Sequence, residues 1–574
     1  MFQCQISYQQ PNLHWLSFQL IIDQLEDDVH LQLPAWRPGR YELGNFAKNI
    51  RNFSVSDSEG NPLPFKKVTK DRWEVATAEV DSITVAYEYY AGELNAGSTW
   101  LDETQVYINF VNCMLYVEER AEEPYRVSLD LPADYQIAGG LPEVTPHVLE
   151  ASSFCRLAES PIIASAHLTH WQYETEGHRF HLWFQGDCYL DEATTLQRFG
   201  AFTHEQLRTM GDFPADDYHF LYHLLPYRAY HGVEHYNSTV IMLGPADQLR
   251  EGSSLYYDFL GVSSHELFHT WNIIRIRPHE MMPYDYAREN YFPTGFVAEG
   301  ITTYYGDLFL VRSGVLTLDE YFLELNKLLQ RHFDNFGRFN ASLVDSSWDL
   351  WLDGYAPGVP DRKVSIYVKG ALVSLILDME LRRCTEGEQS LDTLMRYLWD
   401  YFGKKKRGYT LSNLQKLISD LSGNTLNDYF DRFIFGTEPL EDKLDEVLRT
   451  VGCRLVRREA ARPHERYFGF RTGTGEHALV VQKIAPDSPA AQVLSLDDRL
   501  LAVDGVAPTG EGGGELLTNR ISAELTVLRQ QRVRTLRLHT DKQTYFSYYT
   551  VERHEEATPE GHAAFEAWIG PSGT

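Results

Sequence analysis

The residues most able to do chemistry lie in one short run, His265-Glu266-Leu267-Phe268-His269. On an α-helix, residues four apart lie about 40° apart around the axis and roughly 6 Å apart along it, so both imidazoles can face one ion. Glu266 follows the first histidine and can reach a water molecule at that ion as a general base. The pattern predicts metal-dependent hydrolysis, although the same five-residue spacing also arises by chance in unrelated proteins.

A catalytic zinc site needs three protein ligands and one open position. Glu299 is the candidate third ligand, because it opens the next helical stretch, thirty positions after His269 and beyond a proline-containing loop. A carboxylate in such an apolar, aromatic segment is costly unless it is paired or bound to a metal. We therefore expect one Zn²⁺ per chain, held by His265, His269 and Glu299. An ordinary glutamate at a helix N-terminus is the alternative, and such a ligand set also accepts cobalt or manganese.

Three kinds of segment must position these residues. Residues 1–165 show alternating, aromatic and β-branched runs separated by turn signals, which predict a β-sandwich-like N-terminal domain. Residues 166–445 begin with a few strands and then become mainly helical, as expected for a catalytic domain. Ser263 and Ser264 are the expected caps of a helix that begins at His265, and Thr410 is the expected cap of a helix that Gly423 ends.

The rest of the chain is β-rich again over residues 446–555, followed by a short helix and a frayed tail over 556–574. The fold class is therefore multidomain α+β. With 574 residues and a net charge of −29, the chain has room for several cores and repels phosphate backbones, so nucleic acid is not an expected partner. No window is long and apolar enough for a membrane span, and the N-terminus lacks a signal-peptide pattern. The six scattered cysteines read as reduced thiols, and we expect a cytoplasmic protein.

Several segments together resemble the PDZ-containing glycyl aminopeptidase family, a branch of the gluzincin metallopeptidases. They span almost the whole chain, so their conjunction is far more specific than any single motif. The segments are LPAWRPGRYELGNFAKNI (33–50), YHGVEHYNST (230–239), HELFHTWNIIRIRP (265–278), VAEGITTYY (297–305), and SPAA (488–491) with VDG (503–505). The resemblance implies a thermolysin-like, mainly helical catalytic domain and a C-terminal PDZ-like domain.

The resemblance also implies two further site residues. Tyr367, in Tyr-Val-Lys-Gly, is similar to a tyrosine of related aminopeptidases whose phenol donates to the tetrahedral oxyanion. A core tyrosine is the alternative. Glu234, in Gly232-Val-Glu-His, is similar to a glutamate that holds the free α-ammonium of the substrate, with Gly232 in the same substrate-binding element. The match is partial, because Val and His replace the family's Met and Asn, and a structural glutamate at a strand end is the alternative.

Other residues near these motifs are weaker candidates. Asn272, Arg275 and Arg277 follow the metal helix and can orient ligands or bind peptide, but solvated or paired arginines explain them equally well. Asp307 is a candidate partner of a metal ligand. His231 and His235 flank Glu234 and could form a second metal site, or could be polar histidines with ordinary partners.

Taken together, these residues favour a zinc aminopeptidase that hydrolyses the first peptide bond of short peptides. The resemblance adds a preference for N-terminal Gly or Ala. A zinc endopeptidase with the same metal site is the first alternative, and a PDZ-bearing adaptor with a relic site is the second. Within the C-terminal segment, Tyr467-Phe-Gly-Phe470 resembles a loop that receives a terminal carboxylate, so a peptide or protein ligand is a further expected partner.

Overall fold

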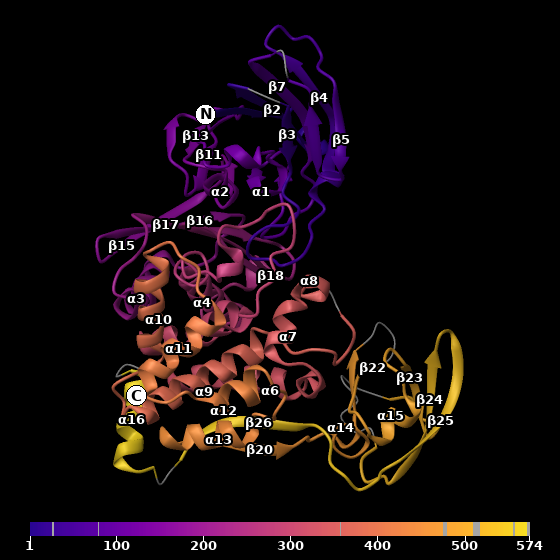
Figure 1. Cartoon of the computed structure of the whole chain (residues 1–574). Helices are drawn as coiled ribbons and strands as arrows, with labels where there is room; N and C mark the ends of the chain where they lie inside the picture. Colours follow the sequence, from indigo (N-terminus) through magenta and orange to yellow (C-terminus); the bar gives the residue numbers. More distant parts are fainter. Residues whose placement is uncertain are drawn as a thin grey trace.

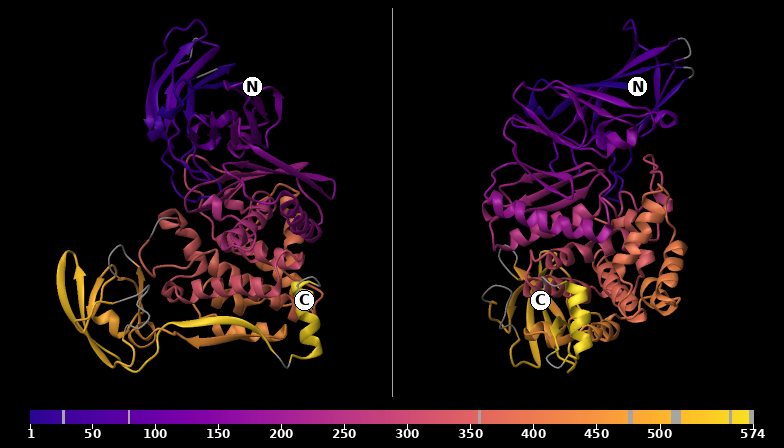
Figure 2. Two further views of the ribbon diagram at one scale, coloured as in Figure 1. Left: turned by 180° about the vertical axis from the view of Figure 1, so that it is seen from behind. Right: turned by 90° about the vertical axis from the view of Figure 1, so that its left-hand side faces the viewer.

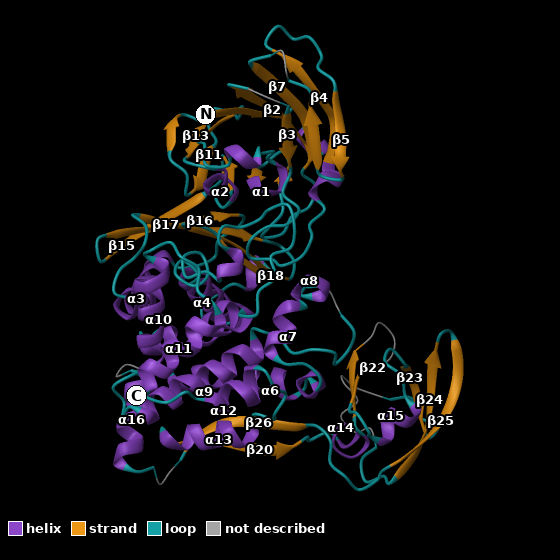
Figure 3. Cartoon of the chain, in the orientation of Figure 1, coloured by secondary structure: helices purple, strands orange, loops and turns teal. Residues whose placement is uncertain are grey.

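Three layers stack along the long axis of the molecule, and a fourth part projects to one side (Figure 1). The structure is a computed structural model that describes residues 1–25, 28–77, 80–355, 358–474, 479–508, 517–554 and 557–570. An N-terminal β domain lies above a mixed five-stranded sheet, and a body of helices covers the opposite face of that sheet (Figures 1 and 3). The C-terminal lobe lies beside the helices, and the two views in Figure 2 place it away from the N-terminal domain.

The N-terminal domain is built from several sheets, and long strands such as Ser82–Tyr90 alternate buried with partly exposed side chains. Because one face of each strand packs inward, this period-two pattern is what a half-buried strand requires. The strands of its seven-stranded sheet, in spatial order, are β12 (Glu143–Thr145), β13 (Val148–Ala151), β10 (Tyr125–Leu129), β1 (Phe2–Ser7), β2 (Trp15–Asp23), β7 (Ser82–Tyr90) and β4 (Ile50–Asp57). One smaller sheet contains, in spatial order, β3 (Val29–Gln32), β6 (Arg72–Val75) and β5 (Phe65–Thr69). Another contains β11 (Gln136–Gly139), β14 (Ile162–Ser165), β9 (Val106–Ile108) and β8 (Trp100–Leu101). Two short helices, α1 (Phe110–Cys113) and α2 (Phe154–Ala158), complete the domain.

The middle sheet carries the first part of the site. Its strand order is β15 (Thr169–Thr175), β16 (His178–Gln185), β17 (Asp217–Leu224), β19 (Ser238–Gly244) and β18 (Ala229–Glu234). Helix α3 (Glu192–Met210) connects the parallel strands β16 and β17. The antiparallel edge strand β18 ends at Glu234.

The helical body carries the rest of the site. Its helices are α4 (Ser254–Phe268), α5 (Thr302–Arg312), α6 (Leu318–Phe333), α7 (Leu343–Trp348), α8 (Leu350–Asp353), α9 (Val368–Cys384), α10 (Leu391–Leu398), α11 (Leu411–Ser422), α12 (Asn427–Tyr429) and α13 (Glu441–Thr450). The multidomain α+β organisation agrees with the sequence prediction. No helix among the described residues combines the length and the apolar character needed to cross a bilayer.

The predicted start of the metal helix is wrong. Helix α4 begins eleven residues before His265, and its cap is Ser253, whose side chain accepts from Tyr256 N. Ser263 and Ser264 lie inside the helix, where the Ser263 hydroxyl donates back to the Phe259 carbonyl at 2.6 Å. The motif therefore sits in the last turn of the helix rather than its first. By contrast, Thr410 caps α11 and Gly423 ends it in a left-handed conformation, as predicted.

The C-terminal lobe contains α14 (Pro463–Phe468), α15 (Pro489–Val493) and a five-stranded sheet. The strands are β21 (Phe470–Thr474), β22 (Leu479–Ile484), β23 (Arg499–Val503), β24 (Ser522–Arg529) and β25 (Arg532–His539). The long ribbon of β20 (Cys453–Glu459) and β26 (Ser547–Arg553) leads to and from the lobe and runs along the helical body (Figure 1). In the loop predicted to receive a carboxylate, the Gly469 N–H already donates to the His464 carbonyl.

The short helix predicted near the end of the chain is present, and residues 571–574 of the predicted tail lie outside the described residues. Helix α16 (Pro559–Ile569) returns to the helical body, where Trp568 is fully buried. Its indole donates to the Tyr304 hydroxyl at 2.9 Å, and Arg312 donates to its carbonyl at 2.9 Å. The last helix is therefore packed against α5 of the helical body through these two hydrogen bonds.

Candidate metal centre and active site

The three expected metal ligands converge from two neighbouring helical segments. His265 lies in the last turn of α4 and His269 follows its end, while Glu299 lies in the π-helical turn Phe296–Ile301 that leads into α5. The two Nε2 atoms are 3.0 Å apart, and Glu299 Oε2 lies 3.8 Å from His265 Nε2 and 3.4 Å from His269 Nε2. π-Helical turns are rare in proteins, but those that occur are frequently found at functional sites.

These three atoms fit a zinc ion in size and in chemistry. With zinc–ligand bonds of about 2.0–2.2 Å, the ligands of a tetrahedral site lie about 3.3–3.6 Å from one another, close to the observed separations. The charges also fit a cation. Burial opposes the charging of His269, yet Glu234, Glu299 and Glu266 outweigh that effect and raise its pKa to about 10. Two imidazoles and a carboxylate with this geometry form a candidate metal centre.

Asn272 fixes the orientation of one ligand. The His269 ring faces the Asn272 carbonyl through Nδ1 at 2.6 Å, which assigns the proton to Nδ1 and leaves the Nε2 lone pair free for a metal. The Asn272 side chain donates to the Val297 carbonyl at 2.8 Å and to the Thr302 hydroxyl at 3.1 Å. Asn272 thus connects the helix of the two histidines to the turn that holds Glu299.

Two more carboxylates lie on the sheet side of the site. Glu234, Glu266 and His269 offer polar atoms that all lie within 4.8 Å of one another. An added Cβ on Gly232 would lie 2.3 Å from Glu266 Oε1, so a glycine there lets strand β18 pass close to the carboxylate. Burial, reinforced by the nearby carboxylates, raises the pKa of Glu266 to about 8 and that of Glu234 to about 7. These are the effects of the protein groups alone, and a divalent cation beside them favours the ionised forms.

Tyr367 lies at the N-terminal end of α9, close enough to Glu299 for that charge to act on its phenol. Burial, reinforced by Glu299, raises its pKa well above the usual value, so the phenol stays protonated and able to donate. The Tyr355 hydroxyl lies 3.4 Å from the Tyr367 hydroxyl. Sequence reasoning missed Tyr355, because no local motif surrounds it and its position depends on the fold.

The N-terminal domain also contributes to the site, which sequence reasoning did not foresee. The loop from Trp36 to Arg40 lies against strand β18: an added Cβ on Gly39 would come 2.6 Å from Glu234 Oε2. The Trp36 indole donates to the Asp285 carbonyl at 2.7 Å and Ala35 N donates to the Tyr286 carbonyl at 2.7 Å, so the catalytic domain holds this loop in place. In the sequence, the surrounding segment 33–50 carries only the family resemblance and no local signal of a role in the site.

The weaker candidates lie outside the ligand set. Arg275 stacks over the Tyr236 ring at 4.3 Å and Arg277 over the Tyr284 ring at 3.7 Å, so both have structural partners. Asp307 forms no hydrogen bond or ion pair with the three ligands in the described part of the chain, and burial raises its pKa to about 7. His231 and His235 join none of the metal-competent groups found among the described residues, and burial lowers the pKa of each to about 3.

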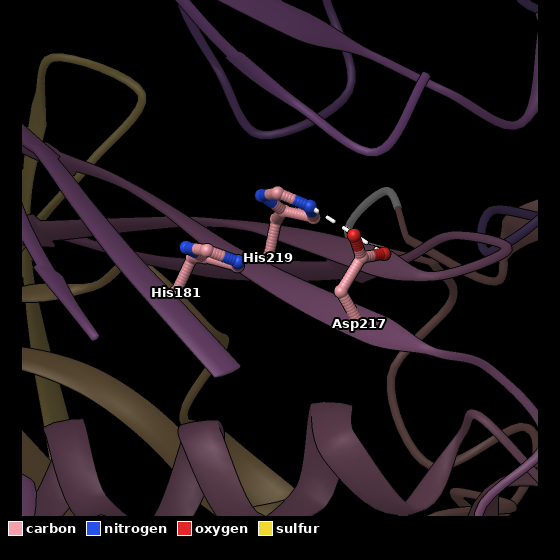
Figure 4. Close-up of side chains that lie close together, drawn as sticks. All are labelled: His181, Asp217 and His219. Carbon is pink, nitrogen blue, oxygen red and sulfur yellow. Dashed lines mark ion pairs between the residues drawn. The ribbon is translucent and has the colours of Figure 1, made fainter. Parts of the chain in front are cut away.

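A second group of metal-competent side chains, His181, Asp217 and His219, lies on strands β16 and β17 (Figure 4). Its two imidazole rings are stacked, with centroids 4.6 Å apart and planes 9° from parallel, so their nitrogens do not point at a shared position. The nitrogens also have other partners. His219 Nδ1 accepts from the Trp183 indole at 3.2 Å, and His181 Nδ1 faces His170 at 3.0 Å. We therefore interpret this group as a polar cluster of the sheet rather than a metal centre.

Comparisons with known proteins match two segments of this chain to a family of peptidases. The Peptidase M61 N-terminal domain matches residues 3–166, and the M61 glycyl aminopeptidase domain matches residues 258–373. A search of curated proteins finds no match. An aminopeptidase N family protein from Idiomarina loihiensis has a similar solved structure, with a TM-score of 0.91, 26% identity and 100% of both chains covered.

More distant structures match part of the chain. An M1 zinc metallopeptidase from Deinococcus radiodurans has a TM-score of 0.49 at 14% identity, covering 76% of this chain and 94% of its own. A yeast LTA4 hydrolase has a TM-score of 0.46 at 14% identity, covering 76% of this chain and 67% of its own.

The peptidase domain, together with the buried group of two histidines and a glutamate, defines this protein as a metallopeptidase. More particularly, its residues 3–166 and 258–373 match the N-terminal domain and the peptidase domain of the M61 glycyl aminopeptidase family.

Proposed function

We propose that this protein is a zinc-dependent aminopeptidase that removes the N-terminal residue from short peptides and prefers Gly or Ala. One observation carries the proposal: His265, His269 and Glu299 face one another at 3.0–3.8 Å, with Glu234 and Glu266 beside them. The preference for a small residue rests on the family, whose peptidase domain is that of a glycyl aminopeptidase.

The metal ligands and Glu266 have separate roles in the proposed reaction. One zinc ion, held by His265, His269 and Glu299, would polarise the scissile carbonyl and lower the pKa of a water molecule towards about 7. Glu266 accepts the proton of the attacking water and passes it to the leaving amine. The Thr239 hydroxyl lies 3.4 Å from Glu266 Oε2 and helps to hold that carboxylate in place.

Tyr367 and Glu234 act on the substrate itself. The protonated phenol of Tyr367 donates to the oxygen that becomes negatively charged in the transition state, where a fixed donor is most effective. Glu234 holds the free α-ammonium of the substrate by a charge-assisted hydrogen bond. Since it is only 5% exposed, its attraction to a cation is weakly screened. Gly232 leaves room beside Glu266 for this arrangement.

The test compares free and N-acetylated alanine amides with wild-type protein, Glu266→Gln and Glu234→Gln. We expect Glu266→Gln to retain its metal and lose turnover, and the acetylated amide to be a poor substrate of the wild type. Hydrolysis by Glu266→Gln at near wild-type rate would refute the role of the base. Equal cleavage of free and acetylated amides would instead favour a zinc endopeptidase.

We also propose that the C-terminal lobe is PDZ-like and offers a site for a peptide or protein ligand. The proposed domains are residues 1–165, 166–445 and 446–555, followed by a tail from residue 556. The five-stranded sheet β21–β25 and a helix capped by Ser488 support this. Titration of the protein with C-terminal and internal peptides, followed by calorimetry, would test it. A lobe that binds neither kind of peptide would contradict it.

A further inference from the structure

One buried cation near the site lacks a counterion. Arg37 is only 5% exposed, and its Nη1 has no hydrogen-bond partner among the described residues. Burial lowers the pKa of Arg37, and no carboxylate of the described residues lies within the 4.0 Å that defines an ion pair with it. Removing a guanidinium from water without a partner is costly, so a group that supplies the missing negative charge is expected at this position.

The space beside Arg37 can hold such a group. A cavity of about 280 Å³ is lined by Arg37, Arg40, Glu42, Asn95, Thr99 and Asn112, among others. The lining also contains Lys48 and Glu93; Arg40 forms an ion pair with Glu42, and Glu93 accepts from the Asn95 amide at 2.7 Å. Asn112 Oδ1, like Arg37 Nη1, is buried without a partner. With three cations (Arg37, Arg40 and Lys48) and two carboxylates (Glu42 and Glu93) in its lining, the cavity has a formal charge of +1.

Contacts connect this cavity to the catalytic residues. The Arg40 guanidinium lies 5.0 Å over the Tyr355 ring, and the Tyr355 hydroxyl is 3.4 Å from that of Tyr367. Gly39, between the two arginines, lies against Glu234, the proposed anchor of the substrate's amino end. The loop from Trp36 to Arg40 therefore lines the cavity through its two arginines and contacts the proposed anchor through Gly39.

We propose that Arg37 binds a carboxylate of the peptide substrate in this cavity, an inference that rests on the proposed aminopeptidase function. A planar guanidinium matches a carboxylate through two parallel hydrogen bonds, and the small volume suits one residue rather than a long side chain or a folded partner. Two sources share this chemistry: the C-terminal carboxylate of a dipeptide or tripeptide, and the side chain of an acidic residue.

The experiment uses matched substrates that differ by one charge. Triglycine is compared with its C-terminal amide, and aspartyl amide with asparaginyl amide, with alanine amide as a reference that has no carboxylate. The variants are Arg37→Gln and Arg37→Lys, and the control is Arg126→Gln, which removes an exposed arginine of the same domain. Binding of triglycine is also measured by calorimetry in the Glu266→Gln background.

We expect Arg37→Gln to lower kcat/KM for the preferred carboxylate substrate by about 10- to 100-fold, as for the loss of one charge-assisted hydrogen bond, and to weaken triglycine binding similarly if the C-terminus is recognised. Alanine amide should change by less than about threefold, Arg37→Lys should restore part of the loss, and Arg126→Gln should behave as wild type. A preference for triglycine assigns the C-terminal carboxylate, and a preference for aspartyl amide assigns the side chain.

Either of two results would overturn the inference: a wild-type enzyme indifferent to both charge pairs, or an equal loss on alanine amide in Arg37→Gln. Failure of the proposed function is distinguishable, because the wild type would then hydrolyse none of these amides, the reference included. A thermal unfolding midpoint for each variant identifies a loss caused by misfolding.

Discussion

A glycine of the N-terminal domain should control the position of the substrate anchor, and Gly39→Ala tests this. Gly39 has a φ of +78°, and an added Cβ would lie 2.6 Å from Glu234 Oε2 and 2.9 Å from Val233 Cγ1. Ordinary contact begins at 3.4 Å, so the carboxylate must move by about 0.8 Å or the loop must shift by as much. Glu234 is only 5% exposed, so this movement must be accommodated inside the protein.

The expected magnitudes follow from these two effects. The left-handed conformation costs alanine about 1–2 kcal/mol, which should appear as a lower free energy of unfolding. Displacing a positioning group by about 1 Å costs up to about 100-fold in rate, so we expect kcat/KM for alanine amide to fall by about 10- to 100-fold. Steady-state kinetics and urea unfolding measure the two quantities separately.

Gly60→Ala is the matched control. Gly60 has a φ of +87°, yet an added Cβ would have no atom within 4 Å. The control should therefore lose similar stability and no activity. If Gly39→Ala keeps wild-type kcat/KM, or if both variants lose activity equally, the contact between the N-terminal loop and Glu234 does not position the anchor.

Three further predictions concern the remaining groups. Tyr367→Phe should lower kcat by about 100- to 1,000-fold with KM and zinc content little changed, as for loss of one oxyanion donor; an unchanged kcat would contradict that role. Chelation should abolish activity and lower the thermal unfolding midpoint, with recovery on adding zinc, since a bound ion stabilises the folded state; activity in fully chelated protein would contradict the metal proposal. His223 has neither ring nitrogen paired among the described residues, and burial lowers its pKa to about 3. In the unfolded chain His223 binds its proton near pH 6.5, so the free energy of unfolding falls as the pH drops from about 6.5 towards 3. This residue alone should lower it by about 2 kcal/mol between pH 7 and pH 5. His223→Phe should remove that part of the slope in urea titrations at the two pH values, and an unchanged slope would contradict it.

The sequence was informative where chemistry depends on spacing along one helix. His265 and His269 face one another because four residues make about one turn, and Asn272 follows within the same segment. The start of that helix was not predictable from its serines, since Ser263 finds a backbone partner within the helix as easily as at a cap. Tyr355 and Arg37 escaped prediction for another reason: each reaches the site through contacts between distant segments, which no local pattern records.

The contact of Gly39 with Glu234 also bears on the choice between exopeptidase and endopeptidase. An endopeptidase must bind a chain that continues towards the N-terminus from the residue before the scissile bond. Its cleft must therefore stay open beyond the site that binds that residue. Here the loop of the N-terminal domain lies directly against Glu234, and hydrogen bonds to Asp285 and Tyr286 hold that loop to the catalytic domain. A loop fixed at this place by the catalytic domain restricts the path of a chain beyond the ammonium group, which supports the aminopeptidase proposal over its alternative.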